Sequence, residues 1–311
     1  MKLMVFGGTG FIGWNAVNHL KNKYEIIVLD KDLQRNRFAK GDNITLIECD
    51  INNFKEMEKA ILSHKPDKIL FLAALSSTPM FFDGTEGNPT NWVRTNTLAF
   101  TEMLGLANRC KVQKIVYAST SSIYSENPVP FREDQCITPK TFYEATLHAR
   151  EGIANAFNRV YGLSSIGLRF FAVYGDGEKI KGKYANNISQ FIWAMKNGKS
   201  PEIYGDGTQT RDFTYIKDVV NAIEKALESD YHGVLNIGTG IETDFKMIVK
   251  YINEVLHTSI KPKYVKNPLK AYVARTLADV SMAKKVLDWK ARFSVKEGIK
   301  DMLETGKDYK T

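Results

Sequence analysis

Short apolar runs alternate with stretches of helical length along the first half of the chain. The first run, residues 2–6, is followed directly by glycines, as expected of a buried strand that ends in a turn. The pattern predicts further strands at 25–29, 44–47, 68–72, 114–118 and 164–169, with helices at 11–21, 53–63, 91–109 and 143–161. Repeated β-α units of this kind form a parallel sheet with helices on both faces.

After about residue 174 the pattern changes, because the strands become short and glycines interrupt the chain. One further core strand is predicted at 234–237, with amphipathic helices at 244–256 and 295–304. We therefore predict an α/β protein with a Rossmann-type doubly wound parallel sheet and a smaller C-terminal α/β substrate-binding region. The first domain covers 1–173, with a strand and a helix returning to it at about 213–237, and the second covers 174–212 and 238–311.

Composition excludes several classes of protein. Hydrophobic residues make up 43% and charged residues 25%, as in ordinary soluble proteins. No apolar run approaches the roughly 20 residues of a membrane span, and glycines stop the first run too early for a signal peptide, so we expect a cytoplasmic protein. The net charge of +8 comes from scattered lysines and arginines, which argues against nucleic-acid binding. Three widely spaced cysteines indicate no disulfide framework and no metal site.

A glycine-rich turn joins the first predicted strand to the first predicted helix. Gly7, Gly10 and Gly13 let the backbone turn tightly and approach a pyrophosphate, and the helix N-terminus offers free N–H groups and a partial positive charge. Asp30 ends the second strand twenty residues after Gly10, where an adenosine ribose is expected to meet a carboxylate. This carboxylate would repel the 2′-phosphate of NADP, so NAD is favoured, although Arg35 and Arg37 follow closely and leave NADP open.

Further motifs resemble those of a known family. They are Cys49-Asp50-Ile51, Leu72-Ala73-Ala74, Asn96, Tyr143, the segment from Arg169 to Gly175, the segment from Ile203 to Val220 and the segment from Ala278 to Trp289. Together they resemble the extended short-chain dehydrogenase family of nucleotide-sugar epimerases, dehydratases and reductases. The resemblance covers nearly the whole chain. It is very specific for the family and only moderately specific for the reaction.

The resemblance implies that NAD is the cofactor. The residues that match cofactor-binding positions of the family are Gly7, Gly10, Phe11, Ile12, Gly13, Asp30, Lys31, Asp50, Ile51, Leu72, Ala73, Ala74, Asn96, Tyr143 and Phe170.

The resemblance also implies a nucleotide-diphosphate sugar as substrate. Matching substrate positions are Ser76, Thr120, Ala172, Asn187, Arg211 and Arg275. Thr120 and Tyr143 match the catalytic pair, in which the hydroxyl orients the reacting sugar and the tyrosine is the base. Arg211 suits the diphosphate because its planar fork binds phosphate oxygens in pairs. Ala172 departs from the asparagine that many relatives have there. The structural alternatives are a strand-end hydroxyl at Thr120, a helix-start aromatic at Tyr143 and a surface ion pair at Arg211.

The catalytic motif of the family, Tyr-x-x-x-Lys, is broken. The chain reads Tyr143-Glu-Ala-Thr-Leu147, and residues four apart share one face of a helix. In relatives the lysine grips the cofactor ribose and lowers the tyrosine pKa, and a change from 10 to 7 takes about 4 kcal/mol. Leu147 supplies neither effect. Three interpretations follow: slow turnover, a specialised oxidation, or an inactive or engineered relative.

The residues after Thr120 bear on the reaction. Related 4,6-dehydratases usually carry acidic residues there, and serine is a poor general acid, so Ser121 and Ser122 argue against dehydration. We expect hydride transfer at C4 of a UDP- or GDP-linked sugar, either as a 4-epimerase or as a dehydrogenase giving a 4-keto sugar, for bacterial surface-polysaccharide precursors. The alternative is a catalytically impaired relative that binds NAD and a nucleotide sugar in a regulatory role.

The family resemblance also implies a homodimer built from the two helices at 91–109 and 143–161. Both segments carry more apolar residues than one buried face needs. Examples from the first segment are Leu98, Phe100, Met103, Leu104 and Ala107.

Overall fold

A computed structural model describes residues 1–39, 42–76, 88–267 and 273–306. The chain divides into two compact units. Unit 1 comprises Met1–Ser125, Ile137–Arg169 and Val220–Leu235, and unit 2 comprises Glu126–Cys136, Phe170–Val219 and Asn236–Thr311.

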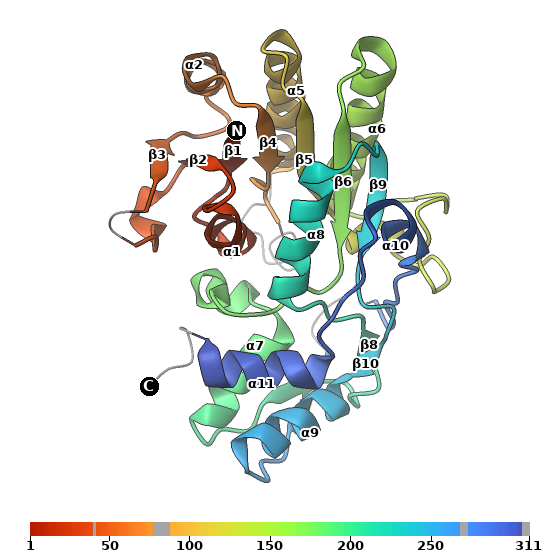
Figure 1. The fold of residues 1–311 in the computed structure, drawn as a ribbon. Helices are drawn as coiled ribbons and strands as arrows, with labels where there is room; N and C mark the ends of the chain where they lie inside the picture. The colour runs from red at the N-terminus through yellow and green to blue at the C-terminus, as the bar shows by residue number, and fades with distance from the viewer. Residues whose placement is uncertain (40–41, 77–87, 268–272, 307–311) are drawn as a thin grey trace. The chain divides into compact units, whose positions relative to one another are not determined.

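A seven-stranded sheet forms the centre of unit 1 (Figure 1). Its strands are β1 (Lys2–Phe6), β2 (Glu25–Asp30), β3 (Ile44–Glu48), β4 (Lys68–Phe71), β5 (Lys114–Thr120), β6 (Ser165–Phe170) and β9 (Gly233–Ile237). The order is β3-β2-β1-β4-β5-β6-β9, and β1 to β5 pair in parallel. This order reverses between β1 and β4, the point at which Rossmann-type sheets bind dinucleotides. The predicted fold class is thus confirmed.

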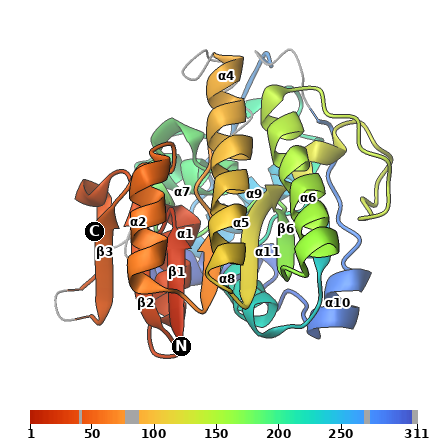
Figure 2. The same ribbon diagram turned by 90° about the horizontal axis from the view of Figure 1, so that it is seen from above.

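Helices cover both faces of this sheet. They are α1 (Phe11–Leu20), α2 (Phe54–His64), α4 (Pro89–Trp92), α5 (Ala99–Arg109), α6 (Phe142–Tyr161) and the unit 1 part of α8 (Ile216–Glu228), with short 3-10 turns at η1 (Leu33–Arg35) and η3 (Ser121–Tyr124). The helices α2, α5 and α6 lie side by side on one face, and α1 and α8 lie on the other (Figures 1 and 2). The helix predicted at 91–109 is continuous, but its middle is a π-helix, η2 (Val93–Leu98).

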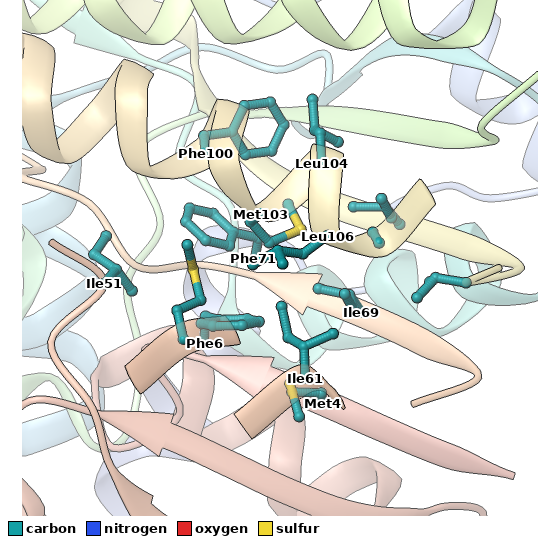
Figure 3. Packing of buried hydrophobic residues seen from close by; sticks show 14 of the residues in the cluster. Met4, Phe6, Ile51, Ile61, Ile69, Phe71, Phe100, Met103, Leu104 and Leu106 are labelled. Atoms are coloured by element: carbon teal, nitrogen blue, oxygen red, sulfur yellow. The ribbon is translucent and has the colours of Figure 1, made fainter. Parts of the chain in front are cut away.

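The main core of unit 1 lies between the sheet and helices α2 and α5. Figure 3 shows apolar side chains from both layers meeting there, including Phe6 and Phe71 from neighbouring strands and Phe100 from α5. The rings of Phe71 and Phe100 meet edge to face, with centroids 5.4 Å apart. Such packing fixes the ends of β1 and β4, where the glycine-rich turn and the segment from Leu72 to Ser76 begin.

Unit 2 is built from two small sheets and several helices. One sheet pairs β8 (Thr210–Arg211) with β10 (Thr243–Asp244), and the other pairs β7 (Glu202–Tyr204) with β11 (Lys263–Val265). Its helices are α7 (Asn187–Lys196), α9 (Phe245–Leu256), α10 (Ser281–Leu287) and α11 (Val295–Thr305), together with the 3-10 segment η4 (Glu178–Tyr184). In the part of the chain that the structure describes, no helix is both long and apolar enough to cross a membrane.

One argument from the sequence is wrong. Phe100, Met103, Leu104 and Ala107 were expected to exceed what one buried face needs, yet all four are fully buried in the core of unit 1. A helix that packs on a sheet and on two neighbouring helices buries a wider apolar stripe than one contact requires. Leu98 alone of the five is exposed, at 41%.

Helix α6 begins with a capping box that sets the position of Tyr143. The Thr141 hydroxyl accepts the Glu144 N–H at 3.2 Å, and the Glu144 carboxylate accepts the Thr141 N–H at 3.2 Å. Both bonds satisfy N–H groups that the helix itself leaves unpaired.

We expect Thr141→Ala to lower the free energy of unfolding by about 1 kcal/mol, because it removes this cap. Thr141→Ser keeps the hydroxyl and is the matched control, with a much smaller loss. Urea unfolding of both variants measures the difference, and equal stability of the alanine and serine proteins would contradict the role of the cap.

Candidate active site

The glycine-rich turn is too close-packed for any side chain at two positions. Gly7 has φ +78°, and a Cβ there would come within 2.9 Å of the Ala73 backbone nitrogen. A Cβ at Gly13 would lie 2.1 Å from the Gly7 carbonyl oxygen. The turn, the first turn of α1 and the segment after β4 are therefore packed backbone against backbone.

The N-terminus of α1 carries no internal compensation for its partial positive charge. Gly10 is the N-cap residue and makes no side-chain capping bond, and the first turn of this ten-residue helix holds no acidic side chain. Free N–H groups beside a turn without side chains fit a pyrophosphate. The residues of this turn therefore fit the dinucleotide that the sequence predicts.

Asp30, at the end of β2, supports the glycine-rich turn directly. One carboxylate oxygen accepts the Thr9 N–H at 3.0 Å, and the other accepts the Asp32 N–H at 3.3 Å. Each oxygen keeps a lone pair for a further donor, as a ribose hydroxyl requires.

The basic residues after Asp30 are engaged with protein groups or exposed. The Arg35 guanidinium lies 2.8 Å from the Asp32 carboxylate, and Arg37 lies over the Trp14 ring at 4.5 Å. Lys31 is exposed.

Asn96 lies in the π-helix and is fully buried. Its side-chain oxygen accepts the Leu75 N–H at 2.9 Å, and its amide donates to the Leu75 carbonyl at 3.1 Å and to the Thr146 hydroxyl at 3.1 Å. These bonds hold the segment that contains Leu72, Ala73 and Ala74 against η2 and α6.

Thr120 and Tyr143 come together from β5 and α6. Both side chains are almost fully buried. Burial raises the pKa of Tyr143 above its ordinary value of 10, whereas a hydrogen bond with the Thr120 side chain acts in the opposite direction. Thr120 also accepts the Ser122 N–H at 3.2 Å, which fixes the turn that follows β5. A hydroxyl bonded to a buried phenol is a suitable pair for moving a proton to and from an alcohol.

Leu147 lies in the apolar surroundings of the tyrosine. It is 3% exposed and packs in one cluster with Leu75, Trp92 and Tyr143. The Trp92 and Tyr143 rings meet edge to face at 5.9 Å. The leucine therefore fills space around the phenol and brings no charge to it.

Sequence reasoning missed Arg150, which is 0% exposed. It donates hydrogen bonds to the carbonyl oxygens of Asn96, Ala73 and Ala118. Asn96 and Ala73 are themselves among the residues predicted to bind the cofactor, and Ala118 lies two residues before Thr120. The signal was available, since residue 150 is seven positions after Tyr143 and shares its helix face.

Three further predicted residues of unit 1 are placed as follows. Asp50 accepts the Asn52 N–H at 2.9 Å in a tight turn after β3, and Ile51 is buried in the core. Ser76 is exposed and directly precedes residues 77–87, which lie outside the described part.

Unit 2 contains the other predicted residues. Phe170, at the end of β6, is 8% exposed. Ala172 has φ +27°, a left-handed conformation that costs an alanine roughly 1 kcal/mol or more and that asparagine tolerates better. Its carbonyl accepts the Asn186 side-chain amide at 3.0 Å. Asn187 is the first residue of α7 and is half-buried.

The two predicted arginines of unit 2 differ in their partners. Arg211 donates to the carbonyl oxygens of Thr210 at 2.7 Å and Ala274 at 3.3 Å. Arg275 makes a two-point ion pair with Glu242, at 2.5 and 3.1 Å.

The motif from Ile203 to Val220 also has a structural task. The buried Asp212 carboxylate accepts backbone N–H groups from Thr239, Gly240 and Ala278. Asp218 accepts those of Arg292 and Phe293. Much of this motif therefore holds unit 2 together.

Comparisons with known proteins agree with this geometry. The model of the NAD dependent epimerase/dehydratase family matches residues 3–238. A UDP-glucuronate 4-epimerase of Thermodesulfobacterium geofontis is 31% identical over 98% of this chain and 96% of its own. A UDP-glucose 4-epimerase of Thermotoga maritima, solved with UDP-glucose, is 31% identical with a TM-score of 0.88 and 96% coverage of both chains. A UDP-N-acetylglucosamine 4-epimerase of Methanobrevibacter ruminantium, in complex with UDP-N-acetylmuramic acid, gives 29%, 0.89 and 97% of both chains.

We expect Gly13→Ala to weaken NAD binding by at least tenfold, because its methyl group collides with the Gly7 carbonyl oxygen. Gly152→Ala, on α6, is the control, because a Cβ there meets nothing within 4 Å. Isothermal titration with NAD measures both. An unchanged affinity in Gly13→Ala would mean that the cofactor does not bind against this turn.

Proposed function

Because this chain belongs to the NAD-dependent epimerase/dehydratase family, we propose that it is a 4-epimerase of a UDP-linked hexose. The observation that carries the proposal is the buried Thr120–Tyr143 pair, which lies in the same unit as the glycine-rich turn. Oxidation of a sugar carbinol needs a group that takes the proton of the hydroxyl, and a phenol hydrogen-bonded to a threonine hydroxyl can serve as that group.

NAD is the cofactor, and the turn at Gly7–Gly13 with the uncapped start of α1 fits its pyrophosphate. When bound there, NAD would supply the hydride chemistry that oxidation and re-reduction of a sugar carbinol require. We assign Asp30 to the adenosine ribose, because both carboxylate oxygens can accept a further hydrogen bond beside the turn.

The protein groups handle the proton. Tyr143 accepts the proton of the sugar C4 hydroxyl during oxidation and donates it back during reduction. Thr120, whose side chain also acts on the Tyr143 phenol, hydrogen-bonds the sugar C4 hydroxyl and orients it. Ser121 and Ser122 follow Thr120 in η3 and supply no carboxylic acid to expel a neighbouring hydroxyl, which favours epimerisation over dehydration.

We propose UDP rather than GDP because the three reported relatives are named for UDP-sugars. In unit 2 we assign Asn187 and Arg211 to the diphosphate. Arg275 is a weaker candidate because Glu242 already holds both sides of its guanidinium. A role in bacterial surface-polysaccharide synthesis stays a prediction from the sequence.

The test mixes the protein and NAD with UDP-glucose, UDP-glucuronate, UDP-N-acetylglucosamine and a GDP-hexose, and separates the products by chromatography. We expect a C4 epimer from one of the UDP-sugars. Tyr143→Phe should lower the rate by at least about a hundredfold, because it removes the proton acceptor. The rate of the unaltered protein should rise with pH above neutrality, because burial raises the pKa of Tyr143 and only the ionised phenol accepts a proton.

Two controls make the outcome specific. Thr120→Ser keeps the hydroxyl and should retain most activity, whereas Thr120→Ala should not. An oxidised 4-keto product without epimer would favour the dehydrogenase alternative. Tight NAD binding with no product from any sugar would favour the binding protein.

We further propose that the protein is a homodimer joined through η2, α5 and α6. The chain exposes several large apolar side chains on these helices, namely Val93, Leu98, Val160 and Tyr161, at 47%, 41%, 68% and 58%. Val93 and Leu98 lie on η2, and Val160 and Tyr161 lie at the end of α6. Exposed large apolar side chains are one feature of interfaces between subunits.

Light scattering at micromolar concentration should give the mass of two chains, and Leu98→Glu should shift it toward one. Leu62→Glu is the matched control, because Leu62 is 45% exposed on α2 and lies outside the proposed interface. A mass of one chain for the unaltered protein would reject the dimer.

A further inference from the structure

Arg150 is a buried cation without a carboxylate partner in the part of the chain that the structure describes. Its guanidinium is 0% exposed and bonds to three carbonyl oxygens, those of Asn96, Ala73 at 3.0 Å and Ala118 at 3.5 Å. It also lies over the faces of Phe71 and Phe100, at 5.2 and 5.4 Å from the ring centroids. Carbonyl dipoles and ring faces reduce the cost of burying the charge, but they do not neutralise it.

The neighbouring arginine shows what a purely structural arrangement looks like. Arg169 is 3% exposed and forms a two-point ion pair with Glu151, at 2.6 and 2.9 Å. It donates to the Tyr124 hydroxyl as well, at 2.7 Å. The charge of Arg169 is therefore matched within unit 1, whereas that of Arg150 is available to an anion formed nearby.

The helix geometry brings this charge toward the catalytic pair. Tyr143, Leu147 and Arg150 are spaced by four and three residues, so they follow one face of α6. Long helical side chains lean toward the N-terminus of the helix, which directs the guanidinium of Arg150 back toward the level of Leu147. Its hydrogen bond to the Ala118 carbonyl places the guanidinium beside β5, two residues before Thr120.

Among the residues that the structure describes, two phenols, Tyr117 and Tyr143, act on the charge of Arg150. Tyr117 is held neutral by complete burial and by the negative charge of Glu151. Tyr143 is the phenol that the proposed reaction ionises. Burial and the Glu144 carboxylate raise its pKa, and the Thr120 side chain and Arg150 lower it. Burial lowers the pKa of Arg150 to about 9, so the guanidinium is charged at neutral pH. A cation held in a low-dielectric interior stabilises such an anion without reorganisation.

We propose that Arg150 is a positioning residue that takes over the electrostatic task of the lysine missing at 147. From one turn further along α6, it supplies the positive charge that stabilises the Tyr143 phenolate, and its bonds to Ala73, Asn96 and Ala118 join the three segments around the phenol. The proposal rests on Tyr143 being the base of the proposed function. It explains how a chain with leucine at 147 retains a functional tyrosine.

The test separates charge from hydrogen bonding at residue 150. Arg150→Gln keeps an amide donor for the carbonyl oxygens and loses the charge, whereas Arg150→Lys keeps the charge. The readout is the tyrosinate absorbance of the NAD-loaded protein during a pH titration, with the Tyr143→Phe protein as the baseline. We expect the midpoint of Tyr143 to rise by about one pH unit or more in Arg150→Gln and to stay near its original value in Arg150→Lys.

The rate of NADH formation in a single turnover should follow the same order. At neutral pH it should fall roughly tenfold in Arg150→Gln and approach the original rate as the pH rises. Equal midpoints in the glutamine and lysine proteins would overturn the proposal and leave Arg150 a structural residue. Arg150→Met replaces the glutamine variant if that protein does not fold. If neither uncharged variant folds while Arg150→Lys does, the charge serves folding and the proposal is likewise overturned.

The titration needs no sugar, so its result is independent of the substrate. A raised midpoint together with no turnover of any UDP-sugar would reject the proposed function and keep the role of Arg150. A C4 epimer formed by the unaltered protein, together with an unchanged Tyr143 midpoint in Arg150→Gln, would keep the proposed function and reject the role of Arg150.

Discussion

The side chains of Arg150 and Glu151 are buried on α6, and the segments around Thr120 and Tyr143 depend on how these two charges are satisfied. Glu151 is paired with Arg169, and it also accepts a hydrogen bond from Ser119 at 2.6 Å. Within the described residues, the close partners of Arg150 are carbonyl oxygens and ring faces. Leaving either charge unsatisfied away from water would cost several kcal/mol, so the segments that supply these partners are held to α6. These segments are the end of β5, the π-helix η2 and Ala73, which packs against Gly7.

The need to satisfy the buried charge of Arg150 also involves η2, the π-helix that packs against α6. The π-helix gives up regular hydrogen bonding around Asn96, whose carbonyl accepts from Arg150 while its side chain pairs with both backbone groups of Leu75. π-helical turns occur frequently at functional sites because they redirect groups that a regular helix would keep in its own bonds. Here the irregular turn links the segment after β4 to the face that carries Tyr143.

The sequence was sufficient to predict the sheet of unit 1, because buried parallel strands are short apolar runs and the glycines between β1 and α1 mark the turn. It did not predict the π-helix, since the partners of Asn96, which are Leu75 and Arg150, lie far from it along the chain. Phe100 and Met103 misled the argument about the dimer, because apolar spacing does not distinguish a core from an interface. Arg150 was missed because the Tyr-x-x-x-Lys motif ends at residue 147, although helical spacing alone puts the arginine on the same face of α6 as Tyr143. In unit 2, the partners of Asp212 and Asp218 come from distant segments, so their structural task could not be read from the motif.

The central claim is that a buried tyrosine without its lysine still supports C4 chemistry on a UDP-sugar, and an isotope label tests it most directly. The measurement is to incubate the protein and NAD with UDP-glucose carrying deuterium at C4, and to follow the label in the recovered sugars by NMR. Hydride removal and return predict that a 4-epimer forms and that both epimers keep the deuterium at C4. Loss of the label to water during epimerisation would contradict the account, because it would mean that the C4 hydrogen leaves as a proton.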